Sequence, residues 1–237
     1  YWHGFCSIRG ETTNVTNSLR SKNMKKAIYG LTLLLMTATA QADMSGNLGY
    51  MSEYHFRGIL QKVSSVSGGL DYESGGFYVG TWAADVGDGL EVDGYFGYGT
   101  EVGDVSLSVG YTGYFYTGDF DDTYQEINLG AGFGMLSLDV AIGEYDNFDG
   151  PTQDYTYYAL TLENNGFYGT YAGFSQDFDG EYLELGYGTT VSDIDLGIAL
   201  ILADKDLTPD FEVDGEFFAT PSDESLVFTI GKSFDLN

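Results

Sequence analysis

Beyond residue 42, the residues of this sequence that could do chemistry are mostly carboxylates, accompanied by one histidine and one arginine. A carboxylate can bind a cation or move a proton, and a histidine held by a carboxylate can activate a nucleophile. The candidate residues named below occupy polar positions in short segments that are otherwise rich in apolar and aromatic side chains. The candidate functional residues are Glu53, His55, Arg57, Glu91, Asp93, Glu126, Asp139, Glu184 and Asp195.

Hydrolysis is one use that His55 suggests. A serine hydrolase needs a nucleophile, a base and an orienting group in contact, and the Gly-x-Ser-x-Gly pattern of one large class does not occur. Proteolysis by carboxylates would need a pair of them beside the histidine, and no such motif is present. We therefore expect no enzyme and keep a hydrolase as a distant alternative.

Acidic stretches at 119–122 and 144–154 suggest calcium binding. Neither has the alternating ligands, central glycine and final glutamate of an EF-hand loop. A solvated acidic surface explains them as well, and loose bridging of divalent cations to lipopolysaccharide stays open. Beyond residue 42 the sequence has no cysteine and one histidine, so we expect no metal centre and no cofactor.

The segments that must position the candidate residues alternate between apolar and polar side chains. Val105, Leu107 and Val109 alternate with Ser106 and Ser108, and a strand with this pattern has one apolar and one polar face. About 12 such segments occur, with lengths suited to tilted membrane strands of roughly 9–11 residues. They centre on 48–56, 66–72, 77–84, 91–99, 105–116, 124–133, 136–145, 155–162, 167–175, 182–189, 194–202 and 226–234.

The links between the segments alternate in length. Every other link is short, as at 73–76, 102–104, 134–135, 164–166 and 191–193. The intervening links are longer and acidic, at 85–90, 117–122, 146–154, 177–180 and 203–224. Outer-membrane barrels have short periplasmic turns and longer outer loops. We predict an all-β, up-and-down antiparallel transmembrane barrel over residues 43–237, in preference to a secreted sandwich or jelly roll.

The start of the chain resembles a secretory signal. A basic start at Met24 to Lys26, an apolar run from Ala27 to Ala38 and the small residues Ala40 and Ala42 predict a signal peptide at 24–42. Residues 1–23 precede its start and are interpreted as a non-native upstream extension. Removal of 1–42 would change the net charge from −27 to −31, leaving four basic and 35 acidic residues.

Charge indicates which face of each segment points inward, because a cation facing lipid at the bilayer midplane costs roughly 2–4 kcal/mol. With Leu48, Tyr50, Tyr54 and Phe56 toward lipid, the interior receives Asn47, Met51, Glu53, His55 and Arg57. The same rule places inside the barrel Glu91, Asp93, Glu126, Asn128, Asp139, Glu184 and Asp195. Arg57 is expected either to pair with Glu53, Glu91 or Asp93 and narrow a pore, or to form a structural ion pair within the wall.

The first segments also carry a more specific pattern. It comprises Phe56-Arg57-Gly58-Ile59, Gln61, Gly68-Gly69-Leu70-Asp71-Tyr72, Ser74-Gly75-Gly76-Phe77-Tyr78-Val79-Gly80-Thr81-Trp82-Ala83, and then Glu91, Asp93, Tyr95 and Gly97. In order and spacing these residues resemble the TorF family of porins of Gram-negative bacteria. The resemblance covers about the first two-fifths of the barrel, with departures at Leu60 and Ala84-Asp85. It implies an outer-membrane barrel and does not specify a solute.

The predicted function is a porin of the outer membrane, which lets small hydrophilic solutes diffuse and prefers cations. The alternative is a barrel plugged by its own side chains, with a structural or adhesive role in the envelope. The inward side chains that could fill it are Tyr95, Tyr114, Tyr116, Tyr158 and Tyr182. Expected partners are outer-membrane lipid, lipopolysaccharide, small solutes or cations and the barrel-insertion machinery, which reads a closing aromatic strand such as 226–234. So acidic a chain should repel nucleic acid.

Overall fold

The computed structural model describes residues 43–208, 211–213, 216–218 and 223–236. The predicted extension at 1–23 and signal peptide at 24–42 lie outside the described residues. The strands are β1 (Asp43–Phe56), β2 (Ile59–Ser74), β3 (Phe77–Gly87), β4 (Gly89–Val102), β5 (Val105–Tyr116), β6 (Tyr124–Phe133), β7 (Leu136–Tyr145), β8 (Gln153–Asn164), β9 (Phe167–Gln176), β10 (Glu181–Val191), β11 (Ile194–Ala203), β12 (Phe211–Val213), β13 (Glu216–Phe218) and β14 (Glu224–Asp235). Among the residues described, no helix is long and apolar enough to span a membrane.

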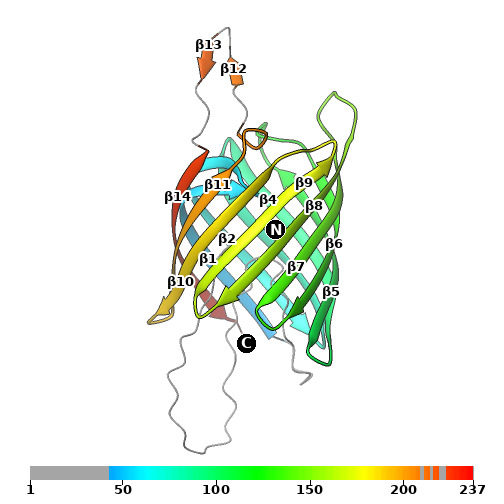
Figure 1. The fold of residues 1–237 in the computed structure, drawn as a ribbon, viewed down its shortest axis with the longest axis vertical. Helices are drawn as coiled ribbons and strands as arrows, with labels where there is room; N and C mark the ends of the chain where they lie inside the picture. The colour runs from blue at the N-terminus through cyan, green and yellow to red at the C-terminus, as the bar shows by residue number, and fades with distance from the viewer. Residues whose placement is uncertain (1–42, 209–210, 214–215, 219–222, 237) are drawn as a thin grey trace, which may run out of the picture.

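Twelve of the strands form one closed antiparallel barrel (Figure 1). Strands that follow one another in the chain pair with one another around the wall, and β14 pairs with β1 to close it. Closure gives the backbone groups of every wall strand a partner on both sides, which a lipid environment requires. The predicted fold class and number of strands are confirmed. β12 and β13 form a separate small hairpin in the link between β11 and β14, where the sequence predicted only a loop.

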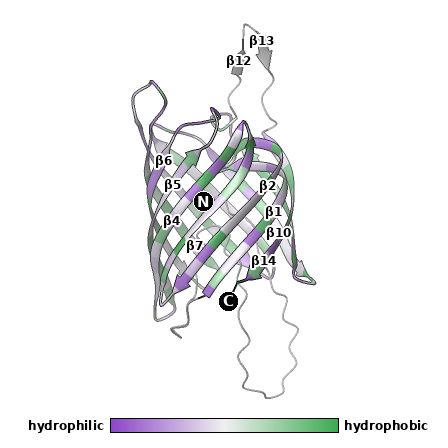
Figure 2. Ribbon diagram, turned by 180° about the vertical axis from the view of Figure 1, so that it is seen from behind, coloured by the Kyte–Doolittle hydropathy of each residue, from purple (hydrophilic) through white to green (hydrophobic). Residues whose placement is uncertain are grey.

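The outer face of the barrel is apolar. On β5, Leu107 and Val109 are 41% and 49% exposed, whereas Ser106 and Thr112 are 6% and 3% exposed. Apolar and polar residues alternate in the same way along many of the strands, as the green and purple bands of Figure 2 show. A closed barrel with an apolar outer face and polar inward positions is built to meet lipid. The face assignment predicted for β5 is confirmed.

The two ends of the barrel differ. At the end where β1 begins and β14 finishes, the turns between strands are 75–76, 103–104, 134–135, 165–166 and 192–193. The opposite end carries the longer links, including 117–123 and 146–152. One predicted long link is wrong: β3 runs to Gly87 and β4 begins at Gly89, so Asp88 alone separates them. Both glycines have a φ of 96°, which side-chain-bearing residues rarely adopt and which permits this tight turn.

This asymmetry predicts the orientation of the chain in a membrane. An epitope tag inserted at Asp121, in a long link, should bind antibody on intact cells. A tag at Gly75, in a two-residue turn at the opposite end, should bind only after the cells are permeabilised. A Cβ at Gly75 would meet no atom within 4 Å, so this turn has room for an insertion. If only the Gly75 tag were labelled on intact cells, the orientation would be the opposite of the one predicted here.

Candidate functional site: a hairpin tip inside the barrel

Strict alternation fails near the end of β1. Met51 and Tyr54 lie three residues apart and should face opposite ways, yet they are 2% and 0% exposed. The pairing with β2 shifts register between Tyr54 and His55, and Ser64 on β2 has a φ of 65°. Both strands are therefore irregular here, as at a β-bulge, which redirects the strand beyond it. The prediction that Tyr54 and Phe56 face lipid is wrong, because both side chains lie inside the barrel.

The turn between β1 and β2 consists of Arg57 and Gly58, with φ values of 51° and 87°. Positive φ at both positions is what a type I′ hairpin turn requires. A Cβ on Gly58 would lie 2.8 Å from Cδ1 of Tyr182 on β10 and 3.0 Å from Cδ1 of Leu207. A larger residue at this position would therefore clash with the wall. We call Phe56, Arg57 and Gly58 the plug.

Arg57 carries the charge of the plug. Its Nη2 donates a hydrogen bond of 2.7 Å to Oε1 of Glu126 on β6, and both side chains are fully buried. Its Cζ lies 4.1 Å from the ring centroid of Tyr157 on β8 and 5.0 Å from that of Phe56. A planar guanidinium suits both contacts, since it pairs with carboxylates and stacks on aromatic faces.

These contacts cross the barrel. In the closed strand order, β6 and β8 each lie five strands from β1, in opposite directions around the wall. The ring of Phe56 also lies 5.4 Å from that of Tyr114 on β5 and 6.1 Å from that of Tyr124 on β6, measured between centroids. The plug therefore spans the interior from its own strands to the far wall, near the end that carries the long links.

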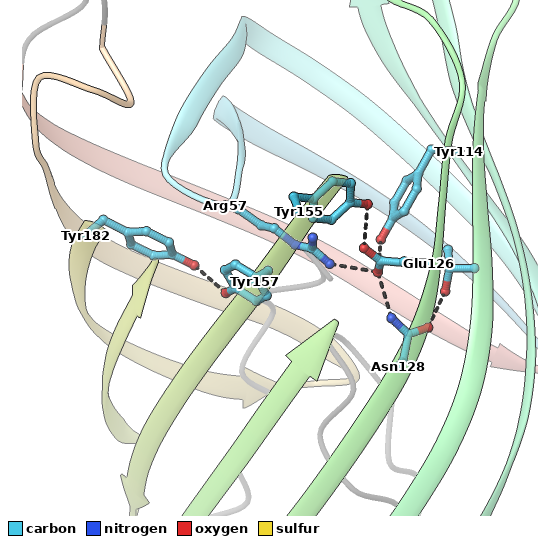
Figure 3. Close-up of polar contacts among 8 residues, drawn as sticks. Arg57, Tyr114, Glu126, Asn128, Tyr155, Tyr157 and Tyr182 are labelled. Carbon is cyan, nitrogen blue, oxygen red and sulfur yellow. Dashed lines mark hydrogen bonds and ion pairs between the residues drawn. The ribbon is translucent and has the colours of Figure 1, made fainter. Parts of the chain in front are cut away.

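Glu126 is the centre of a hydrogen-bond network (Figure 3). Its Oε1 accepts from Tyr114 at 2.9 Å and from Asn128 at 2.7 Å, in addition to Arg57, and its Oε2 accepts from Tyr155 at 2.8 Å. A buried carboxylate with this many donors is held in one orientation. Glycine at 143 makes the Tyr155 contact possible, because a Cβ there would lie 2.5 Å from the Tyr155 ring.

A second group of carboxylates lies beside the plug on β4. Tyr54 donates to Oε1 of Glu91, and Tyr116 donates to its Oε2 at 3.3 Å. Asp93 faces the same way two residues further along and is 2% exposed. Its Oδ1 has no hydrogen-bond partner among the described residues.

The other predicted site residues point inward but stand apart from the plug's ion pair. Glu184 accepts a 2.5 Å hydrogen bond from Tyr168, and Asp195 accepts a 2.6 Å bond from Thr190. Asp139 is half-buried, and its cross-strand partners are Gly130 on β6 and Ala159 on β8. The structure thus spreads these carboxylates around the wall and does not gather them into one centre.

His55 is buried, and its Nε2 lies 2.9 Å from Oε2 of Glu53.

The ion pair of Arg57 differs from the predicted one. The predicted partners were Glu53, Glu91 or Asp93, whereas the structure pairs Arg57 with Glu126. Within the described residues, no group of three or more His, Cys, Asp or Glu side chains could hold a metal ion.

Sequence reasoning missed part of the plug's surroundings. Tyr155 and Tyr157 were not identified as site residues, although with Ala159 they form an inward series of one parity on β8. Tyr158, predicted to point inward, lies on the opposite face and donates to Glu181 at 2.9 Å. If Ala159 is taken as an inward position of β8, strict alternation places Tyr155 and Tyr157 inward as well.

With this geometry established, comparison with known proteins identifies the family. A model for a bacterial family of unknown function, Gcw_chp, matches residues 36–234. The chain belongs to this family. The family description names neither an activity nor the TorF porins. Among curated proteins, none matches the chain.

Solved structures resemble the barrel at low sequence identity. A structure from work on the in-meso crystallization of membrane proteins is 9% identical, with a TM-score of 0.50, over 82% of this chain and 84% of that one. Outer membrane phospholipase A from Escherichia coli is 10% identical, with a TM-score of 0.40, over 90% and 95%. A porin variant from Rh. blastica is 11% identical, with a TM-score of 0.37, over 84% and 100%. At this identity, the first likeness concerns the fold alone.

Proposed function

We propose that this protein is an outer-membrane channel for small hydrophilic solutes, that it prefers cations, and that the plug closes it in the conformation described here. The observation that carries the proposal is the buried Arg57–Glu126 ion pair, which joins the tip of one hairpin to the opposite wall. An apolar outer face supports placement in a membrane, and the resemblance to TorF porins supports the outer membrane of a Gram-negative bacterium.

Cation preference follows from the charges of the inward side chains. Glu91, Asp93, Glu184 and Asp195 are buried carboxylates on inward faces of the wall, and Glu126 already neutralises Arg57. Excess negative charge along a narrow path concentrates cations and repels anions.

A second candidate function is a barrel that stays closed and has a structural role in the envelope. The number of aromatic contacts around the plug favours it, because Phe56, Tyr114, Tyr124 and Tyr155 belong to one buried apolar cluster. The two candidates make different predictions about ion flow. A permanently closed barrel would pass no current in any variant that retains its fold.

Planar-bilayer recording in a KCl gradient tests the proposal. The reversal potential of any current should show cation preference at low salt. The preference should fade in concentrated salt, because the Debye length falls from about 10 Å at 0.1 M to about 3 Å at 1 M. Replacing Asp195 by asparagine, which removes one inward charge away from the plug, should reduce the preference without changing closure. Anion preference at low salt would contradict the charge assignment.

A further inference from the structure

A buried carboxylate beside the plug is left without the donors that its neighbours have. Glu126 accepts from Arg57, Tyr114, Asn128 and Tyr155. By contrast, Asp93 is 2% exposed, and its Oδ1 has no hydrogen-bond partner among the described residues. A desolvated carboxylate without a donor is costly, so the environment calls for a positively charged or donating ligand.

The neighbours of Asp93 add charge of the same sign. Glu91 lies two residues away on the same face of β4 and is fully buried. Two of the described cations have carboxylate partners other than Asp93: Arg57 pairs with Glu126, and Lys62 pairs with Asp85 at the end of β3. A cation placed between Glu91 and Asp93 would offset this local excess.

The residues around this pair define the chemistry of the cation. Trp82 is paired with Asp93 in the β3–β4 register and is buried. The ring of Tyr54 meets that of Trp82 edge-on, with 5.7 Å between centroids, while its hydroxyl donates to Glu91. Carboxylates combined with an electron-rich indole suit an ammonium group, which donates up to three hydrogen bonds and is attracted to aromatic faces.

A hydrated divalent ion fits this setting less well. Such ions take six or more oxygen ligands, whereas the described part of the chain has no group of three acidic or metal-binding side chains. Two carboxylates can accept the hydrogen bonds of one ammonium group, and the indole can contact its apolar part, so the site suits a monovalent organic cation.

We propose that Glu91, Asp93 and Trp82 form a binding site for the ammonium group of a small organic cation inside the barrel. The ammonium donates to Oδ1 of Asp93 and to the carboxylate of Glu91 and lies against the indole of Trp82. The inference rests on the proposed function in one respect, namely that cations reach the barrel interior.

Tryptophan fluorescence can detect this binding, because the sequence has two tryptophans, Trp2 and Trp82. The full chain carrying Trp2→Phe should be purified in detergent and titrated with methylammonium chloride at constant ionic strength. A saturable change in Trp82 emission is expected, and potassium chloride at the same concentrations should not reproduce it. A flat titration, or an equal response to potassium, overturns the proposal.

The decisive variant is Asp93→Asn, which removes the charge and keeps the shape. It should weaken methylammonium binding by about tenfold or more, since it removes a charge-assisted hydrogen bond. Asp195→Asn is the matched control, because it neutralises another buried inward carboxylate, one that already has a donor in Thr190. Equal methylammonium binding by Asp93→Asn and the parent chain would contradict the proposed site.

Glu91→Gln provides a second test if Asp93→Asn fails to fold, as judged by its heat-dependent gel migration. It too should weaken binding, and unchanged binding would overturn the site. The titration does not depend on current through a bilayer. Binding without conductance in both the parent chain and Arg57→Ala would contradict the channel and keep the site, whereas cation-selective conductance with a flat titration would contradict the site alone.

Discussion

Replacing Arg57 by alanine is expected to open the barrel. The change removes the one charged contact between the plug and Glu126 and also the stacking on Tyr157. Breaking a buried ion pair by removing one partner costs about 3–5 kcal/mol, and each 1.4 kcal/mol is a factor of ten in an equilibrium. The docked state of the plug should therefore lose roughly a hundredfold or more in population, and single-channel recordings should show a large rise in open time.

The control for this experiment is Lys62→Ala. Lys62 pairs with Asp85 where both side chains are partly exposed, and such pairs contribute little. This variant should conduct like the parent chain. If Arg57→Ala also conducts like the parent while retaining its fold, the plug does not close the barrel.

A double-mutant cycle with Glu126→Gln separates the ion pair from the surrounding contacts. Glutamine keeps the shape of the side chain, and with its oxygen at the Oε1 position it still accepts from Tyr114, while its amide nitrogen takes the place of Oε2 and can donate to the hydroxyl of Tyr155. If the ion pair holds the plug, Arg57→Ala and Glu126→Gln should each raise the open time, and the double variant should add little to Arg57→Ala. Fully additive effects would show that the two residues act independently.

Placing an arginine on the outer face should prevent insertion. Val109 is 49% exposed and lies in the middle part of β5, between Tyr98 and Leu129 in the register. Val109→Arg puts a cation against hydrocarbon, at a cost of about 2–4 kcal/mol near the bilayer midplane. The fraction folded into lipid vesicles, measured by heat-dependent gel migration, should fall steeply.

Ser108→Arg is the matched control one residue away. Ser108 points inward and lies between Gly99 and Gly130 in the register, so its two cross-strand partners have no side chains. The inward arginine also joins an acidic interior. This variant should insert nearly as well as the parent chain, and equal loss in both variants would contradict the face assignment of β5.

The sequence by itself determined the wall of this barrel. Period-two alternation is local information, because each side chain's face depends only on its position along its own strand. Three predicted strands, 105–116, 124–133 and 136–145, have the observed bounds, and the others are extended in the structure by a few residues at one or both ends, most of all on β2. Charged positions such as Glu126 and Asp195 marked the inward face correctly, because lipid excludes them.

Only the tertiary structure decided what the interior contains. An irregularity between Met51 and His55 reverses the faces of Tyr54 and Phe56, and a strict alternation pattern has no way to signal it. Arg57 then meets Glu126, 69 residues later in the chain, because the closed strand order brings their side chains together across the barrel. Such a contact depends on the register and curvature of all the strands between them, and therefore on the assembled barrel as a whole.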